Sequence, residues 1–268
     1  MVTVEAIYTS PVKSLGLAQP EAVRVDPRGI TEDRRFHLVG PLGALLTQRE
    51  VGRLVQVKAE YQPEPEWLRL QFPGGSSLEG PVELGQPVVT QIWGRNVAGR
   101  VLSGDWNDAL SGFCGQAVRL VRSDQPGQCY DEYPISLVSQ ASIEGLSRQP
   151  GAPAGFEGRR FRPNFLLAGC GPHEEDSWIG ATVRIGEELL LRVVARDPRC
   201  AITTHDPQSG NRDVDTLRLI LSYRPSFLGR TRAAYFGVYG IVDRPGTVSL
   251  GDEVVLHPVG EERLHITS

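Results

Sequence analysis

Cys200 lies in the segment of this sequence that is best equipped for chemistry, Arg199-Cys-Ala-Ile-Thr-Thr-His-Asp206. A thiol next to a cation loses its proton more readily, and the thiolate is both a nucleophile and a ligand for soft metals. A free cysteine is also often just a small buried hydrophobic residue. The residues alone leave these interpretations of Cys200 open. The other three cysteines, Cys114, Cys129 and Cys170, are expected to be buried and inert.

Basic side chains occur beside Ser, Asp or Asn at three further places, Lys13-Ser14, Asp33-Arg-Arg35 and Arg159-Arg-Phe-Arg-Pro-Asn164. Ammonium and guanidinium groups make strong, charge-assisted hydrogen bonds to anions. A helix that begins at Ser139-Gln-Ala-Ser142 would add backbone N–H donors for the same anion. Together the segments suit a small ligand that carries a phosphate group, although each one alone could serve only a surface ion pair.

His205 follows Cys200 by five residues, so a Cys–His nucleophilic pair is one hypothesis, although nothing in the sequence places the two in contact. His205 and Asp206 could also serve proton transfer, and Asp206 is therefore a candidate catalytic residue. An Asp-Pro turn more often has a structural role. The sequence contains no Gly-x-Ser-x-Gly elbow, P-loop, Gly-x-Gly-x-x-Gly or Cys-x-x-Cys motif, which argues against the hydrolases, nucleotide-binding proteins and zinc ribbons that use them.

The composition is that of a folded protein. Of the 268 residues, 40% are hydrophobic and 22% are charged, and the formal charge of −4 gives no reason to expect a nucleic acid partner. The start of the chain, Met1-Val-Thr-Val-Glu5, lacks the features of a signal peptide, and no apolar run is long enough to cross a bilayer. A cytoplasmic protein with no membrane partner is expected. Lys13 is notable because Lys58 is the only other lysine.

Apolar and polar residues alternate through most of the chain, with turn residues at short intervals, and this pattern predicts antiparallel β structure with few helices. The polar residues 123–131 form the predicted boundary between two β-rich modules, residues 1–122 and 123–268. Helices are predicted at residues 105–113, from Ser139 onward, and at residues 213–223. Strands are predicted at residues 2–6, 22–25, 35–39, 44–47, 55–59, 67–72, 88–93, 97–102, 118–121, 135–138, 164–168, 182–185, 189–194, 236–242, 247–250 and 254–256.

Eight short motifs, distributed over nearly the whole chain, together resemble the MOSC superfamily with its N-terminal companion domain. This group includes the mitochondrial amidoxime-reducing component and its bacterial relatives. Each motif alone is weakly specific, whereas eight in the same order are strong evidence of resemblance. The motifs are Ile7-Tyr-x-x-Pro11-Val-Lys-Ser14, Gly29-Ile-x-x-Asp33-Arg34, Leu46-Thr-Gln-Arg49, Phe161-Arg-Pro-Asn164, Glu175-Asp-Ser-Trp178, Arg199-Cys200-x-x-Thr-Thr-x-Asp206-Pro-x-x-Gly210, Phe236-Gly-x-Tyr239 and Pro245-Gly-x-Val-x-x-Gly251-Asp252.

The resemblance implies a mainly β fold with a few helices (α+β), in which a MOSC β-barrel and a smaller β-rich N-terminal domain hold molybdenum cofactor (Mo-molybdopterin) between them. In this family the cysteine that matches Cys200 is the molybdenum ligand. The residues that match cofactor-binding positions are Lys13, Ser14 and Arg34 on the N-terminal side, and Ser139, Ser142, Arg162, Asn164, Arg199, Cys200 and Tyr239 on the MOSC side.

The resemblance also implies an oxidoreductase that reduces N-hydroxylated substrates such as amidoximes and hydroxylamino bases. Electrons would come from a separate protein (a ferredoxin, a flavin reductase or a b-type cytochrome), since no ferredoxin domain follows Ser268, and pyridoxal phosphate is not expected. Two alternatives stay open: sulfur transfer through a Cys200 persulfide, and a non-catalytic cofactor carrier. Asp197-Pro198 stands where many relatives have a cysteine and a serine, which changes the expected pocket.

Overall fold

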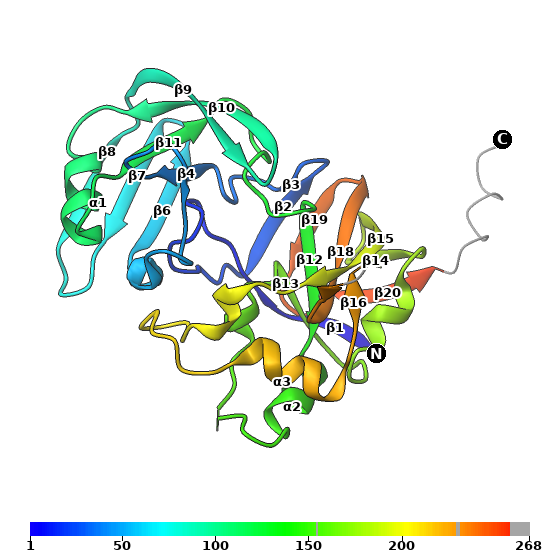
Figure 1. The fold of residues 1–268 in the computed structure, drawn as a ribbon. Helices are drawn as coiled ribbons and strands as arrows, with labels where there is room; N and C mark the ends of the chain where they lie inside the picture. Colours follow the sequence, from blue (N-terminus) through cyan, green and yellow to red (C-terminus); the bar gives the residue numbers. More distant parts are fainter. Residues whose placement is uncertain (154, 229–230, 258–268) are drawn as a thin grey trace, which may run out of the picture.

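Strands dominate the structure and form two β-rich parts that lie next to each other (Figure 1). The computed structural model describes residues 1–153, 155–228 and 231–257, so the last eleven residues of the second predicted module, 258–268, lie outside the described residues. Three α-helices occur among the described residues. The mainly β fold class with a few helices is therefore confirmed.

The N-terminal part contains two antiparallel sheets that enclose a hydrophobic core of their own, built around buried residues such as Phe36, Leu54 and Leu68. A five-stranded sheet has the order β5-β4-β11-β10-β9, and a three-stranded sheet has the order β6-β7-β8. The bounds are β4 Phe36–Val39, β5 Leu45–Leu46, β6 Lys58–Pro63, β7 Glu66–Gln71, β8 Ser77–Pro81, β9 Leu84–Ile92, β10 Arg95–Leu102 and β11 Arg119–Ser123.

The second part is a closed barrel of seven strands in the order β1-β13-β12-β18-β15-β14-β20, closed by pairing of β20 with β1. Only β12 and β13 run parallel; the other neighbours are antiparallel. Buried aliphatic residues, among them Ile7, Leu137 and Val193, fill the interior. The bounds are β1 Val2–Ile7, β12 Ile135–Ser139, β13 Phe165–Ala168, β14 Thr182–Ile185, β15 Leu189–Pro198, β18 Tyr235–Arg244 and β20 Glu253–His257.

The chain crosses between the two parts more than once. The barrel takes its first strand, β1, from the N-terminus, and β2 (Ala22–Asp26) pairs with both β3 (Gly29–Ile30) and β19 (Gly246–Ser249). A small hairpin, β16 (Phe227–Leu228) and β17 (Thr231–Arg232), completes the strands. The predicted division at residues 122 and 123 stays a prediction, and the strand pairing adds that β1 belongs to the barrel.

The three helices begin close to their predicted starts, and two of them have a side-chain N-cap. Ser139 caps α2 (Gln140–Ser147), since its side chain accepts a hydrogen bond from the Ser142 backbone N–H. Asp105 precedes α1 (Trp106–Cys114) without making a side-chain cap hydrogen bond. The predicted helix at 213–223 is shorter, α3 (Thr216–Tyr223), because Asp215 serves as its cap. Helices α2 and α3 pack on the outside of the barrel.

Two local predictions are wrong. Residues 55–59, expected as one strand, divide into the end of a 3₁₀ helix (η1, Gly52–Gln56) and the start of β6. The turn expected at residues 94–96 is instead the two-residue loop Trp93-Gly94, because Ile92 pairs with Arg95. In the part of the chain that the structure describes, no helix has both the length and the hydropathy needed to cross a membrane.

Candidate functional site

A cavity of about 510 Å³ lies where the N-terminal sheets meet the barrel. Its walls come from loops that follow β1, β3, β5 and β9, from the segments before β12 and β13, from the end of β15 with the residues that follow it, and from the middle of β18. The volume is in the range of protein sites for small molecules and cofactors.

Eight of the ten predicted cofactor-binding residues lie in the wall of this cavity. They are Lys13, Ser14 and Arg34 from the N-terminal side, and Arg162, Asn164, Arg199, Cys200 and Tyr239 from the barrel side. These residues are far apart in the sequence, so only the folded chain brings them together. The cofactor-binding role of each stays a prediction.

Ser139, Ser142 and Asp206 do not line the cavity. Ser139 and Ser142 are fully buried at the start of α2, where the Ser139 backbone N–H and the Ser142 hydroxyl donate to Glu175 Oε1 at 3.1 and 3.2 Å. Asp206 Oδ1 accepts hydrogen bonds from the backbone N–H groups of Gln208 and Ser209. All three side chains therefore organise local structure, and we do not include them in the site proposed below.

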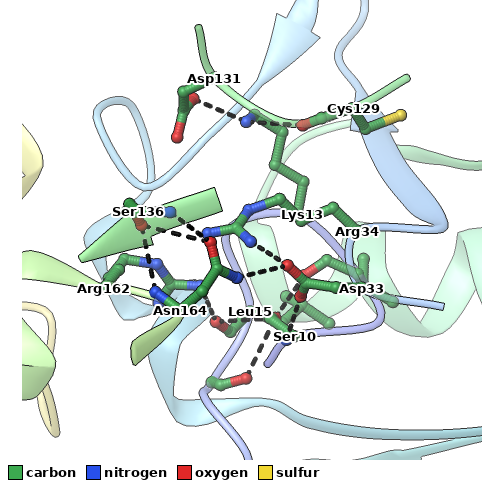
Figure 2. Close-up of polar contacts among 12 residues, drawn as sticks. Ser10, Lys13, Leu15, Asp33, Arg34, Cys129, Asp131, Ser136, Arg162 and Asn164 are labelled. Carbon is green, nitrogen blue, oxygen red and sulfur yellow. Dashed lines mark hydrogen bonds and ion pairs between the residues drawn. The ribbon is translucent and has the colours of Figure 1, made fainter. Parts of the chain in front are cut away.

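Lys13 forms the cationic edge of the cavity next to the 129–131 segment (Figure 2). Its ammonium donates to the Cys129 carbonyl at 2.9 Å and to Asp131 Oδ1 at 2.7 Å, and the side chain is buried. Burial lowers the pKa of Lys13, and the Asp131 carboxylate opposes that shift. Burial alone would raise the pKa of Asp131, but Lys13 and Arg34 hold it well below its usual value. The two side chains therefore face each other as an ion pair.

Asp33 connects the two parts of the molecule beneath the cavity. Its carboxylate pairs with Arg34, accepts the Ser10 backbone N–H at 2.7 Å and accepts the Asn164 side-chain amide at 3.2 Å. Asn164 is fixed in turn, because its Oδ1 accepts the Ser136 backbone N–H at 3.0 Å. These contacts hold the Arg34 guanidinium in the cavity wall.

Arg162 lies in the same wall as Arg34, and Nη2 of Arg162 donates to the Leu15 carbonyl at 2.9 Å. Burial, and then the Arg34 guanidinium, lowers the pKa of Arg162 to about 10. An anion bound in the cavity would relieve the repulsion between the two guanidinium groups, which the Asp33 and Asp131 carboxylates also oppose. The pair is therefore suited to a phosphate group.

Arg199 enters the cavity from the end of β15. Its Nε donates to the Phe236 carbonyl at 2.8 Å, and its Nη1 lies 2.5 Å from Asp197 Oδ2. Nη2 of Arg199 is buried and has no hydrogen-bond partner among the described residues. Burial raises the pKa of the Asp197 carboxyl to about 6, although Arg199 opposes the shift. Arg199 thus offers an unsatisfied donor, which a bound ligand would satisfy.

Cys200 is the one cysteine among the four that is not buried, and it lies in the cavity wall. The loop that follows Cys200 is held in place from two sides. On the barrel side, Arg160 makes a bidentate ion pair with Asp213 at 2.7 and 2.8 Å. On the N-terminal side, the Gln56 amide donates to the Ser209 carbonyl at 2.7 Å. The thiol is thus accessible to the cavity and carried by a fixed loop.

Backbone strain is concentrated around the cavity. Six non-glycine residues of the described chain have a positive φ, and four of them line the cavity. Such conformations are costly and cluster at binding and catalytic sites, where the surrounding structure enforces them. The four are Ser14, Arg34, Trp93 and Arg162, with φ of 74°, 51°, 49° and 50°.

The donor set fits a cofactor that combines a phosphate with a metal taking soft sulfur. Lys13, Arg34, Arg162 and the unsatisfied Arg199 Nη2 supply positive charge and donors for the phosphate. Cys200 supplies the single sulfur. Within the described residues no group of three or more His, Cys, Asp or Glu side chains could hold a metal ion, so the cofactor itself would have to provide the remaining ligands.

Several residues of the wall are not among the predicted site residues, notably Trp93, Asp131 and Arg160. Asp131 is the last residue of a polar stretch interpreted only as a module boundary, and Arg160 belongs to a basic segment of which other members were chosen. For Trp93 a signal existed, because a bulky aromatic residue before glycine is unusual in a tight turn.

Comparison with known protein families agrees with the two-part structure. The family model of the MOSC N-terminal beta barrel domain matches residues 1–117, and that of the MOSC domain matches residues 113–255.

Relatives with curated names match nearly the whole chain. Mitochondrial amidoxime reducing component 2 of Rattus norvegicus is 30% identical, over 94% of this chain and 82% of the relative. Mitochondrial amidoxime-reducing component 1 of Mus musculus is 29% identical, over 95% and 82%. Molybdenum cofactor sulfurase of Caenorhabditis elegans is 25% identical, over 88% of this chain but 33% of that longer protein.

Proposed function

Because the chain belongs to the MOSC family and also carries the MOSC N-terminal domain, we propose that it binds molybdenum cofactor in the cavity and reduces N-hydroxylated substrates there. The observation that carries the proposal is the convergence of Lys13, Arg34, Arg162 and Arg199 with Cys200 on one cavity. The relatives named for amidoxime reduction support the reaction.

In this proposal the cationic residues hold the phosphate of the cofactor and Cys200 holds its molybdenum. When bound, the cofactor supplies the two-electron chemistry. Cleavage of the N–O bond of a hydroxylamine or amidoxime consumes two electrons and two protons, and the oxygen leaves as water.

The protein must therefore position the substrate oxygen near Cys200 and admit protons. Asp197 lies in the wall with a pKa of about 6, raised by burial, and is able to exchange a proton near neutral pH. A separate electron-transfer protein supplies the electrons. This donor is a ferredoxin, a flavin reductase or a b-type cytochrome, and the reaction takes place in the cytoplasm.

The test begins with cofactor content. The protein is expressed in a host that makes molybdenum cofactor, and molybdenum and pterin per chain are measured for the wild type, Cys200→Ser and Cys114→Ser. Cys114 is a matched control, because it is buried in α1 and does not line the cavity. We expect near-stoichiometric metal in the wild type and in Cys114→Ser, and loss of metal in Cys200→Ser. Equal metal in all three proteins would show that Cys200 is not the ligand.

Activity is measured next, with an artificial reductant and a panel of amidoximes and hydroxylamines. We expect conversion to the corresponding amidines and amines. A metal-loaded protein that leaves the whole panel unchanged would overturn the reductase proposal.

Sulfur transfer is a second candidate, favoured by the accessibility of Cys200 alone among the cysteines and by the similarity to a cofactor sulfurase. It predicts a sulfane sulfur on Cys200 after incubation with a cysteine desulfurase. An unchanged mass of the peptide containing Cys200 would argue against it. A cofactor carrier would instead bind the cofactor, pass it to an apo-enzyme and show no turnover.

A further inference from the structure

Trp93 occupies the first position of the two-residue loop that joins β9 and β10. Ile92 and Arg95 pair across the loop, and Trp93 and Gly94 have φ of 49° and 83°. Tight hairpin loops with two positive φ values favour Asn, Asp or Gly at the first position, whereas a bulky side chain is strained there. The loop alone therefore gives no reason for a tryptophan.

The indole ring is held in one orientation at the cavity wall. Its Nε1 donates to Asp131 Oδ1 at 3.0 Å, and the guanidinium carbon of Arg49 lies 4.3 Å from the ring centroid. Asp131 is itself fixed by Lys13. The strained backbone, the hydrogen bond and the cation–π contact thus combine to present this ring to the cavity.

Trp93 is only partly covered, although Arg49 packs on the ring and the Lys13 ammonium lies 5.9 Å from its centroid. Trp93 is 44% exposed, whereas Lys13 on the same wall is 5% exposed. Lys13, the cation proposed to hold the cofactor phosphate, is therefore the more deeply buried of these two neighbours, and Trp93 is the one that a ligand can reach from the solvent. This position is suited to a ligand that enters after the cofactor is bound.

We infer that Trp93 is a stacking platform that selects planar aromatic N-hydroxylated substrates over aliphatic ones. The inference rests on the proposed function and names the substrate class of that same site. Stacking on an aromatic side chain requires a flat π surface, which aryl amidoximes and hydroxylamino heterocycles have and alkyl amidoximes lack. Tyr130 and Tyr133 add aromatic surface to the same wall.

The decisive variant is Trp93→Asn, which removes the ring and places in the loop a residue that tolerates positive φ. Loss of function in this variant is then not explained by strain in the hairpin. Trp93→Phe keeps an aromatic face and serves as the conservative variant. Trp67→Leu is the matched control, because Trp67 on β7 is exposed to nearly the same extent, 42%, and does not line the cavity.

Each cofactor-loaded protein is assayed with benzamidoxime and with acetamidoxime, using an artificial reductant. For Trp93→Asn we expect kcat/KM for benzamidoxime to fall by about 5- to 100-fold, mostly through KM, and that for acetamidoxime to change less than twofold. Trp93→Phe should recover most of the loss, and Trp67→Leu should match the wild type.

Calorimetry gives a readout that does not depend on turnover. Binding of benzamidine, the reduction product, to the oxidised protein should weaken in Trp93→Asn and not in Trp67→Leu. Equal losses for both amidoximes, or lower molybdenum and pterin content in Trp93→Asn, would overturn the inference. If the wild type reduces neither compound, the proposed reductase function fails. The role of Trp93 in stacking is then judged by calorimetry alone, and unchanged benzamidine binding in Trp93→Asn would overturn it as well.

Discussion

The side-chain amide of Asn164 donates to Oδ2 of Asp33 at 3.2 Å, across 131 residues of sequence (Figure 2). Asn164 immediately precedes β13 of the barrel, and Asp33 lies in the turn after β3. The contact joins the two halves of the cavity wall and positions Arg34, which pairs with the same carboxylate. The geometry of the candidate site thus depends on a bond between the two parts of the molecule.

Asp33→Asn should therefore destabilise the protein and weaken cofactor retention. The substitution leaves the poorly exposed Arg34 guanidinium without its carboxylate partner, which we expect to cost about 3 kcal/mol in the free energy of unfolding. Urea unfolding and molybdenum analysis check both effects. Asp243→Asn is the control, because it breaks a more exposed ion pair with Arg192 and should cost less than about 1 kcal/mol. Equal costs for the two variants would contradict the role given to Asp33.

The two lysines of the chain provide a matched pair for the cofactor site. Lys13 lines the cavity, and Lys58 is exposed on β6. Removal of one charge-assisted bond should weaken phosphate binding by about 10- to 100-fold in Lys13→Met. The measurement is pterin retained per chain after extensive dialysis, with folding checked by circular dichroism. Lys58→Met should retain as much as the wild type, and the same retention by Lys13→Met would remove Lys13 from the site.

Gly210 lies in the loop that follows Cys200, where the backbone of this loop packs closely against Gly52 of the N-terminal part. Its φ is 76°, and a Cβ there would lie 2.1 Å from the Gly52 carbonyl oxygen. Gly43 has nearly the same φ, 75°, but nothing lies within 4 Å of a Cβ. Gly43→Ala should cost only the backbone strain, about 1–2 kcal/mol, whereas Gly210→Ala should cost about 3 kcal/mol or more because backbone must move.

Thermal and urea unfolding of both alanine variants distinguish strain from steric overlap. Molybdenum content adds a second readout, since displacement of the loop at Gly210 should also displace Cys200. Similar stability of the two variants would mean that the loop does not need the close contact with Gly52.

His37 should make the protein sensitive to mild acid. Burial, and then Lys13, lowers the pKa of His37 to about 4, and its Nε2 lies 2.9 Å from the Thr90 hydroxyl. Below about pH 6.5 the unfolded chain binds a proton at this residue that the folded chain does not bind, so stability falls as pH decreases toward 4.

At pH 5, His37 lowers the free energy of unfolding by about 2 kcal/mol relative to neutral pH, at 1.36 kcal/mol for each pH unit below 6.5. His37→Gln keeps a hydrogen-bonding group for Thr90 but has no proton to gain. The loss of stability between pH 7.5 and pH 5, measured by urea unfolding, should therefore be smaller by about that amount than in the wild type. An unchanged pH dependence would show that His37 is protonated in the folded protein.

Local patterning was sufficient to predict most of the secondary structure. Strand β14 follows from alternating apolar residues, β4 and β12 follow from short, mainly apolar runs, and α2 follows from the Ser139 cap, because each depends on near neighbours in sequence. The pairing of β2 with β19 could not be predicted in this way, since the two strands lie at opposite ends of the chain.

In the candidate site too, some residues could be predicted from the sequence, whereas others depend on contacts between distant parts of the chain. Resemblance to a family pointed to Lys13, Arg34 and Cys200, and the cavity contains all three. The partners of these residues depend on tertiary contacts: the Lys13 ammonium meets Asp131 across 118 residues, so no motif could nominate that carboxylate. Ser139 is a different case: the structure shows it as the cap of α2, away from the cavity wall, and its predicted part in cofactor binding stays a prediction.

The placement of β1 has a consequence for synthesis of the chain. This strand is synthesised long before its partners β13 and β20. The N-terminal sheets, whose core lies within residues 12–120, have all their strands available much earlier. They are thus free to fold while Val4 and Ile7, which are buried in the finished barrel, remain uncovered. The barrel cannot close until β13 and β20 have been made, and during that interval the apolar residues of β1 are open to aggregation or to binding by a chaperone.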